Sequence, residues 1–236
     1  MSKRVELHEE FINGVATYDL TINSKSGITV RVYEPERKSN DDSKFPIVLH
    51  FHGGGFCISQ YDWAMYYHVY TKFARMARAV DRRIRDKLAE PDRELARSDF
   101  NRVFLIGDSS GGNLVHAVVA PAGEVDLSPV RLAGAVPVHP GFVRSVRSES
   151  EKRKEFETPF LTVDMVDKFL AMALPRGSTK DHPITCLMGE AAPPLSGMKF
   201  PPYMVAVAEN DLIKEMRLGL TIWIMKRLTR HVINMS

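Results

Sequence analysis

The feature that most constrains this chain is the pentapeptide at 107–111, Gly-Asp-Ser-Ser-Gly. The apolar run 103–106 comes directly before it, and a helix-compatible stretch at 113–120 follows it. A strand, a G-x-S-x-G turn and a helix make so tight a corner that glycines are needed where side chains would collide. The corner lifts the serine oxygen clear of the sheet edge, and the helix N-terminus behind it favours developing negative charge. The pattern therefore predicts a nucleophile at Ser109, with a helix-capping serine as the structural alternative.

A second glycine-rich motif, His-Gly-Gly-Gly-Phe at 52–56, follows another apolar run at 46–51. Small residues at such a place allow backbone N–H groups to face the oxygen of a bound substrate, although a glycine-rich turn without a ligand has the same composition. Because G-x-S-x-G alone arises by chance in many chains, the pair is more informative than either motif. The two motifs in this order predict acyl-transfer chemistry.

Size and charge limit the classes of function. The chain has 236 residues, 44% of them hydrophobic, which is enough for a sizeable core, and its net charge of +3 gives no reason to expect a nucleic-acid partner. Its two cysteines, Cys57 and Cys186, are predicted to be reduced thiols, and no metal site is expected. The N-terminus lacks the apolar segment of a secretory signal, and no apolar run is long enough for a membrane span. We therefore expect a soluble cytoplasmic protein.

The order of apolar segments predicts an α/β architecture. Alternating residues at 15–22 and 28–33 predict a half-buried hairpin, whereas the unpatterned runs 46–51 and 132–138 predict strands that are buried on both faces. A three-to-four spacing predicts a helix over 64–80 whose hydrophobic face consists of Met65, Val69, Phe73, Met76 and Val80. At this helical spacing, Met65 and Met76 are expected to be core or pocket-lining residues. Strands that alternate with helices favour a mostly parallel sheet with helices on both faces.

Residues 142–200 differ in character from the rest of the chain. They are richer in charge and proline and contain one helix-like stretch, 163–173. We interpret them as a lid- or cap-like insertion in a single domain of residues 1–236. The run 203–208 then restores a buried strand.

Together these residues resemble a known family. The motifs at 52–56 and 107–113, with His-Pro-Gly at 139–141 and Asp-Leu-Ile at 211–213, are similar to those of the hormone-sensitive-lipase-like carboxylesterases. Within that family they resemble the plant carboxylesterase group, which also contains the gibberellin receptors. The resemblance implies an α/β-hydrolase fold, a Ser-His-Asp triad, a small-molecule ester substrate, and no metal or organic cofactor.

The same resemblance implies roles for individual residues. Ser109 would be the nucleophile and Asp211 the acid that orients the histidine, with the oxyanion held by backbone N–H groups of Gly54, Gly55 and Ser110. Asp211 follows a buried strand, in agreement with the chain order Ser, Asp, His of these hydrolases, although an Asp there can also cap the next helix. The receptors characteristically have serine where this chain has Gly55, so this glycine favours the esterases.

Two departures from the family pattern predict an incomplete sheet. Residues 81–97 carry eleven charges in seventeen positions, so they cannot form the buried inner strand that the family has there. The family's histidine follows one further strand in a Gly-x-x-His-x-Phe motif. Here the last histidine, His231, has no strand or glycine turn before it, so we do not expect it to be the base. We expect His116, His139 and His182 to be satisfied or exposed rather than catalytic.

The sequence thus predicts a serine carboxylesterase that forms an acyl-enzyme. Because a triad base contributes much of the rate, this chain should be a weak esterase at best. Two alternatives remain open. One is a non-catalytic ligand-binding protein like the gibberellin receptors, and the other is a shortened product without activity.

Overall fold

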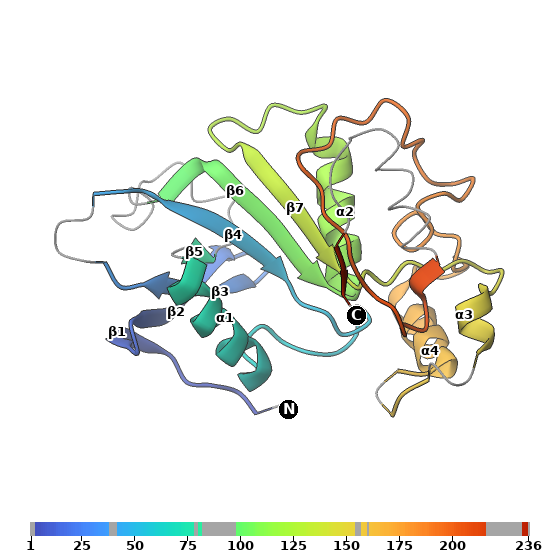
Figure 1. Cartoon of the computed structure of the whole chain (residues 1–236), viewed down its shortest axis with the longest axis horizontal. Helices are drawn as coiled ribbons and strands as arrows, with labels where there is room; N and C mark the ends of the chain where they lie inside the picture. Colours follow the sequence, from blue (N-terminus) through green and yellow to red (C-terminus); the bar gives the residue numbers. More distant parts are fainter. Residues whose placement is uncertain are drawn as a thin grey trace. The chain divides into compact units, whose positions relative to one another are not determined.

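The computed structural model describes residues 3–37, 42–77, 80–81, 98–153, 157–159, 161–215 and 233–235 (Figure 1). The strands are β1 (His8–Ile12), β2 (Val15–Asn23), β3 (Ile28–Pro35), β4 (Phe45–Phe51), β5 (Val80–Asp81), β6 (Ser98–Asp108), β7 (Leu132–Val138), β8 (Ala206–Ala208) and β9 (Ile233–Met235). The helices are α1 (Ala64–Ala77), α2 (Ser110–Ala122), α3 (Glu149–Lys152) and α4 (Val163–Ala173). Within the described ranges, no helix has the length and apolar character needed to cross a membrane.

The chain forms two compact units. The first consists of Met1–His50, Ser59–Phe104 and Ser128–Ala133. The second consists of Phe51–Ile58, Leu105–Leu127 and Gly134–Ser236. The strands follow the order β1-β2-β3-β5-β4-β6-β7-β8-β9.

The first unit contains the predicted hairpin. β2 and β3 pair antiparallel along their length, and β1 pairs antiparallel with the other edge of β2. β5 pairs antiparallel with β3 and parallel with β4. The antiparallel pairing confirms the predicted hairpin at 15–22 and 28–33. The predicted half-buried alternation is wrong, since three consecutive residues are buried in each strand, 15–17 in β2 and 31–33 in β3.

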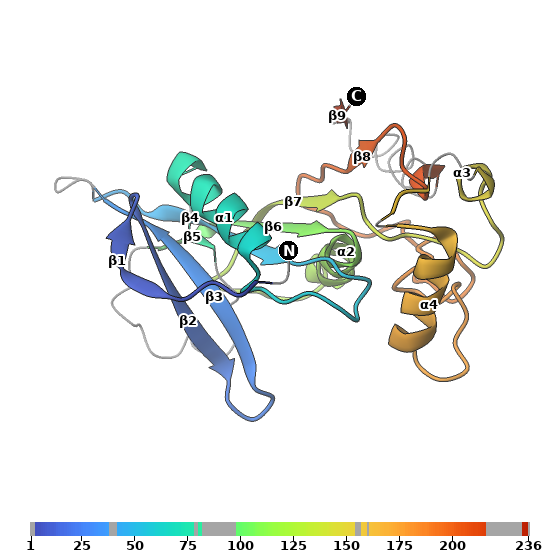
Figure 2. The same ribbon diagram turned by 90° about the horizontal axis from the view of Figure 1, so that it is seen from below.

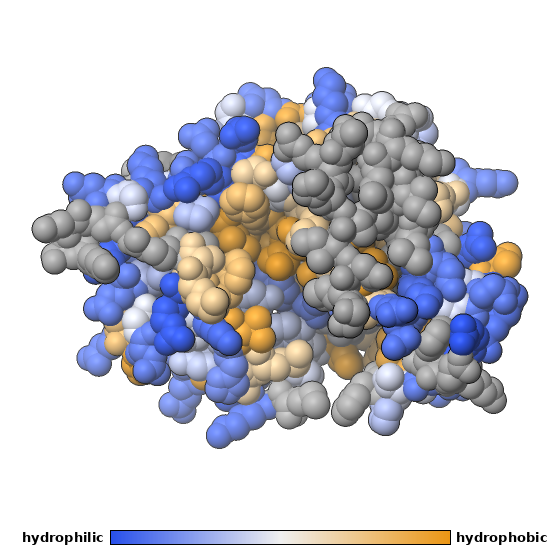
Figure 3. Space-filling model, viewed as in Figure 1, coloured by the Kyte–Doolittle hydropathy of each residue, from blue (hydrophilic) through white to orange (hydrophobic). Residues whose placement is uncertain are grey.

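The predicted helix at 64–80 is confirmed as α1, but the predicted buried face is wrong. Met65 is 42% exposed, Val69 59% and Met76 72%, and Figure 3 shows hydrophobic side chains over the region that α1 occupies in Figure 1. The buried residues are instead Tyr66, Tyr70 and Ala74. The reason is the size of the tyrosine rings, since large aromatic side chains bury more surface than methionine or valine and stack on one another.

The second unit contains the ends of the central strands and two predicted elements. β7 matches the predicted strand at 132–138, and α4 matches the helix-like stretch at 163–173. β7 pairs parallel with β8, which pairs parallel with β9. In Figure 2, α2 and α4 lie on the same side of β7.

Both places where the sequence predicts a missing strand hold only short strands. The inner position between β3 and β4 is occupied by the two-residue β5, and β9, beside β8, has three residues. The highly charged segment 82–97, like His231, lies outside the described residues. The structure thus has a strand at both positions where the sequence predicted none, with two residues of β5 and three of β9 among the described residues.

The segment that was interpreted as an insertion carries α3 and α4. Thr162 begins α4 as its N-cap, because its side chain accepts a hydrogen bond from the Met165 N–H at 3.2 Å. Val166 and Leu170 on α4 then pack in one cluster with Leu212 and Ile213. The helix is thus held against the segment that follows β8.

Candidate active site

Ser109 lies at the corner between β6 and α2. Its backbone has φ 53° and ψ −122°, a positive φ that is uncommon and costly for residues other than glycine. Two backbone hydrogen bonds hold this conformation: the Ser109 N–H donates to Val138 O at 2.9 Å, and the Gly112 N–H donates to Ser109 O at 2.8 Å. The strained corner has the geometry that the pentapeptide predicts for a nucleophile.

The glycines of the corner allow backbone to touch backbone. A Cβ added at Gly107 would lie 2.4 Å from Gly111 O, and one added at Gly111 would lie 1.9 Å from Phe51 O. Both distances are far shorter than the contact of two heavy atoms. Any side chain at either position would therefore push α2 away from the strands that support it.

The glycine loop at 53–55 is joined to the corner by a side chain of the pentapeptide. Gly53 N–H donates to Asp108 Oδ1 at 3.1 Å. Gly54 and Gly55 have φ values of 116° and 59°, in the region that favours glycine. Gly54 O accepts the N–H of Cys57 at 3.0 Å, which closes the loop into a turn. Asp108 thus has the structural role of fixing the loop beside Ser109.

A cavity of about 230 Å³ lies between the loop and the corner. Gly54, Gly55, Ser109 and Ser110 line it. The rest of the described lining is mainly apolar and comes largely from α4, with Leu161, Met165, Val166, Phe169, Leu170 and Ile213 among them. The structure therefore brings together four of the five predicted site residues around one cavity.

Ser110 is the first residue of α2 and is 4% exposed. Backbone N–H groups in the first turn of a helix have no acceptor within the helix. The Ser110 N–H is therefore a donor that could bind an anion near Ser109. It lies at the N-terminal end of α2, where negative charge is favoured.

The fifth predicted residue, Asp211, is not among the described residues that line the cavity. It follows β8, and its Oδ1 accepts the Ile213 N–H at 3.0 Å, which is the contact expected of a helix cap. Its Oδ2 lies 3.7 Å from His139 Nδ1, with the side chains 13% and 33% exposed respectively. The structure thus pairs Asp211 with a histidine that sequence reasoning set aside.

The signal that would have found His139 is its place after β7. β7 and β8 pair in parallel, so residues that follow them meet at the same edge of the sheet. His139 and Asp211 both occupy that edge.

The hydrogen bonds of His139 indicate its tautomer. His139 Nδ1 accepts the Ala208 N–H at 3.2 Å, so in the neutral ring the proton is on Nε2. A triad histidine needs the opposite arrangement, with Nδ1–H directed at the acid and a bare Nε2 directed at the serine. His139 in this position does not have the arrangement of a triad base.

Within the part of the chain that the structure describes, no three His, Cys, Asp or Glu side chains are grouped as a metal site would require. The residues around the cavity therefore offer hydroxyl and backbone N–H groups as their polar chemistry.

Comparison with known proteins identifies the fold family of the chain. Residues 82–221 match the model of a family with the alpha/beta hydrolase fold. The chain is 29% identical over 196 residues to probable carboxylesterase 6 of Arabidopsis thaliana, covering 72% of this chain and 58% of that protein. It is 28% identical over 250 residues to the gibberellin receptor GID1C of Arabidopsis thaliana, covering 92% of this chain and 72% of the receptor. This chain thus spans little more than half of the carboxylesterase.

A solved structure shows the same fold. The esterase of Pyrobaculum calidifontis matches with a TM-score of 0.69 at 23% identity, covering 93% of this chain and 75% of that one. At this identity the match establishes the architecture, a parallel sheet with helices, and not the reaction.

Proposed function

Because the chain belongs to the alpha/beta hydrolase fold family, we propose that it is a carboxylic ester hydrolase whose nucleophile is Ser109. The observation that carries the proposal is the strained backbone of Ser109, with φ 53°, in a cavity that the glycine loop also lines. Strain at a single residue persists where the surrounding structure holds it, and such residues cluster at active sites. The carboxylesterase among the relatives supports an ester as the substrate.

The reaction would begin with attack of Ser109 Oγ on the ester carbonyl. The oxyanion would be stabilised by the backbone N–H groups of Gly54, Gly55 and Ser110, since loss of one such donor typically costs about 3–4 kcal/mol of transition-state stabilisation. As the acyl-enzyme forms, the bond to the alkoxy oxygen would break and that oxygen would take up the proton that Ser109 Oγ gives up, so the alcohol leaves. Water would then attack the acyl-enzyme, releasing the carboxylic acid and returning a proton to Ser109 Oγ.

The step of this cycle that the described residues support least is removal of the proton from Ser109 Oγ. His139 is next to Asp211, yet it accepts a backbone hydrogen bond on the nitrogen that a triad base uses as a donor. Loss of a triad base costs about a millionfold in kcat, and the oxyanion donors and binding alone keep roughly a thousandfold over water. We therefore propose a weak esterase, with a rate set by the nucleophile and oxyanion donors.

The test is hydrolysis of p-nitrophenyl acetate by the purified chain, beside Ser109→Ala and the surface control Ser178→Ala. We expect slow hydrolysis that Ser109→Ala removes and Ser178→Ala preserves. Labelling with a fluorophosphonate, followed by peptide mass spectrometry, should place the adduct on Ser109. Equal rates for the parent chain and Ser109→Ala, together with no adduct, would refute the serine mechanism.

A second candidate is a ligand-binding protein without turnover, as the receptor relative suggests. The observation that favours it is the tautomer of His139, which leaves the described cavity without a base. Gly55 speaks against it, because the receptors have serine there. Fluorophosphonate labelling distinguishes the two functions. A ligand that protects Ser109 from the fluorophosphonate without being hydrolysed would support the binding protein and not the esterase. A cooperative thermal transition of the chain would in turn exclude the alternative of a product that does not fold.

A further inference from the structure

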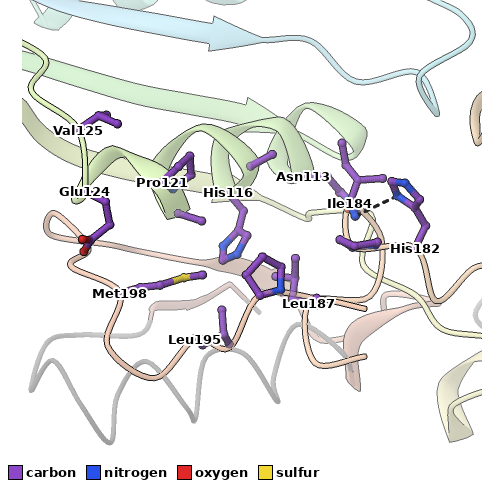
Figure 4. Close-up of a pocket in the computed structure, with 15 residues that line it drawn as sticks. Asn113, His116, Pro121, Glu124, Val125, His182, Ile184, Leu187, Leu195 and Met198 are labelled. Carbon is purple, nitrogen blue, oxygen red and sulfur yellow. Dashed lines mark hydrogen bonds between the residues drawn. The ribbon is translucent and has the colours of Figure 1, made fainter. Parts of the chain in front are cut away.

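A second cavity, of about 560 Å³, lies along α2 and shares no lining residue with the cavity at Ser109. One wall is the face of α2 that carries His116, Ala117 and Ala120. The facing wall comes from the segment 182–198 and includes Leu195 and Met198. Figure 4 shows these walls opposite each other, with the His116 ring projecting from α2 between them. Its size is within the range of pockets that hold small organic ligands, and most of its lining is hydrophobic.

His116 is the polar group at the centre of this cavity, and it is 4% exposed. Its Nδ1 lies 3.1 Å from the hydroxyl of Tyr203, which has no other hydrogen-bond partner among the described residues. Burial raises the pKa of Tyr203, so the phenol keeps its proton. A buried O–H is satisfied only as a donor to an acceptor, and His116 Nδ1 is the acceptor within reach. The Tyr203 hydroxyl therefore donates to Nδ1.

This assignment fixes the other nitrogen of the ring. With Nδ1 as an acceptor, the neutral imidazole carries its proton on Nε2. Burial lowers the pKa of His116 to about 4, which keeps the ring neutral at neutral pH. No acceptor for the Nε2–H is present in the part of the chain that the structure describes. The cavity thus contains one buried, directed donor. His182 also lines it, and because its Nδ1 accepts the Ile184 N–H at 3.3 Å, its Nε2–H is a second donor, on a ring that is only partly buried.

We propose that this second cavity binds a small, uncharged and mainly apolar molecule, whose one acceptor oxygen receives a hydrogen bond from His116 Nε2. Among the described residues, the lining contains no Lys or Arg to neutralise an anion, and the carboxylate of Glu124 disfavours one. A ketone or ether oxygen matches the buried donor of His116, whereas a molecule with several polar groups would leave some of them unsatisfied against the hydrophobic lining.

The wall between the two cavities is fixed by Asn113. Its Nδ2 donates to Gly141 O at 3.1 Å and to Ile184 O at 2.7 Å. Gly141 lines the cavity at Ser109, and Ile184 lines the second cavity. Because Asn113 holds both loops, the second cavity is preformed, and its ligand does not need to reach Ser109. This proposal is therefore independent of ester hydrolysis.

The experiment compares menthone with p-menthane, which share a carbon skeleton and differ by the carbonyl oxygen. Binding is followed by NMR of the methionine methyl groups in the full chain, since Met198 lines the second cavity and Met165 the cavity at Ser109. We expect menthone to shift the Met198 signal in a saturable way and to leave Met165 unchanged. No Met198 shift up to the solubility limit of menthone would overturn the proposal.

Two helix variants localise the ligand. Ala117→Leu places a larger side chain in the cavity and should abolish the Met198 shift. Val118→Leu, at a neighbouring position of α2 that is 43% exposed and outside the lining, should preserve it. Unchanged binding in Ala117→Leu would overturn the proposal.

The role of His116 is tested by the double variant His116→Phe/Tyr203→Phe, which removes both polar groups and leaves neither unpaired. The ratio of the two affinities should move toward p-menthane by roughly three- to tenfold, the value of one hydrogen bond. An unchanged ratio would refute the hydrogen bond. Nitrogen chemical shifts of the His116 ring in the parent chain give the same answer without a variant, because they must report the Nε2–H tautomer and must move when menthone binds.

Discussion

The ring of Phe169 lies directly over Gly55. A Cβ added at Gly55 would lie 2.7 Å from Phe169 Cγ, and the backbone of Gly55 has a φ of 59°. Cys57 Sγ donates to Phe169 O at 3.3 Å, a second contact between the same two segments. The glycine loop and α4 are therefore packed as one wall of the cavity, with the aromatic ring in the space that glycine leaves.

Replacing Gly55 by serine should disturb this wall. Gly55→Ser adds a side chain at a positive φ and against the ring, which should destabilise the fold by about 1–3 kcal/mol and lower kcat/KM for p-nitrophenyl acetate. Urea unfolding and ester hydrolysis measure the two effects.

The double variant Gly55→Ser/Phe169→Ala is the control for the ring contact. It should recover part of the stability lost in Gly55→Ser, because the colliding ring is absent. Strict additivity of the two single variants would contradict the contact.

Removing the Phe169 ring should widen the range of acyl groups that the cavity at Ser109 accepts. Phe169→Ala enlarges the cavity of about 230 Å³, so the ratio of kcat/KM for p-nitrophenyl hexanoate over acetate should rise by roughly tenfold or more. Met172→Ala, on the same helix and 65% exposed, is the matched control and should leave the ratio unchanged. A rise in both variants would mean that α4 acts through its stability and not through Phe169.

The corner at Ser109 should tolerate no Cβ. Gly111→Ala places a carbon 1.9 Å from Phe51 O, and we expect a loss of more than about 3 kcal/mol or failure to fold. Gly177→Ala is the comparison, since Gly177 has a φ of 82° with nothing within 4 Å of an added Cβ. It should cost only about 1–2 kcal/mol, the price of backbone conformation. Thermal unfolding of both variants tests the difference, and equal losses would contradict a steric cause.

His116 should make the chain sensitive to acid. Its pKa falls from 6.5 to about 4 on burial, so between these values the unfolded chain binds a proton that the folded chain does not. Stability should therefore be complete above pH 6.5 and fall as the pH drops toward 4, by about 3 kcal/mol from this group. Urea unfolding across this range should show a shallower pH slope for His116→Phe/Tyr203→Phe, in which carboxylate titration remains. Identical slopes would exclude His116 as the source.

Local patterns predicted the local parts of the site. The corner at Ser109 depends on glycines whose need is set by neighbours in the chain and by one strand-to-helix turn, so the local pattern predicted it. Gly54 and Gly55 were assigned by the resemblance to the carboxylesterase family. The partner of Asp211 depends on which strands are adjacent. His139 precedes Asp211 by many residues, and only the parallel pairing of β7 with β8 places the two at one edge.

The size of the side chains explains why the predicted buried face of α1 was wrong. The three-to-four spacing of its hydrophobic residues predicted a helix correctly, because both faces of that segment are periodic. Periodicity does not choose between methionines and tyrosines, and the contact of Tyr70 with Tyr33, at 5.9 Å between ring centroids, decided the face. His116 was expected to be satisfied or exposed rather than catalytic. The structure shows that it is buried and that its Nδ1 has a hydrogen-bond partner, the Tyr203 hydroxyl.

The approach of Gly111 to the Phe51 carbonyl also determines how this scaffold can diversify. No side chain lies between α2 and β4 at Gly111, and none can be added there. Substitutions at this contact therefore either leave the position of Ser109 unchanged or disrupt the fold. New preferences for an acyl group must then arise elsewhere, on α4, where an exchange such as that of Phe169 alters the cavity and spares the corner. The chain thus separates a part that evolution can only keep from a part that it can adjust.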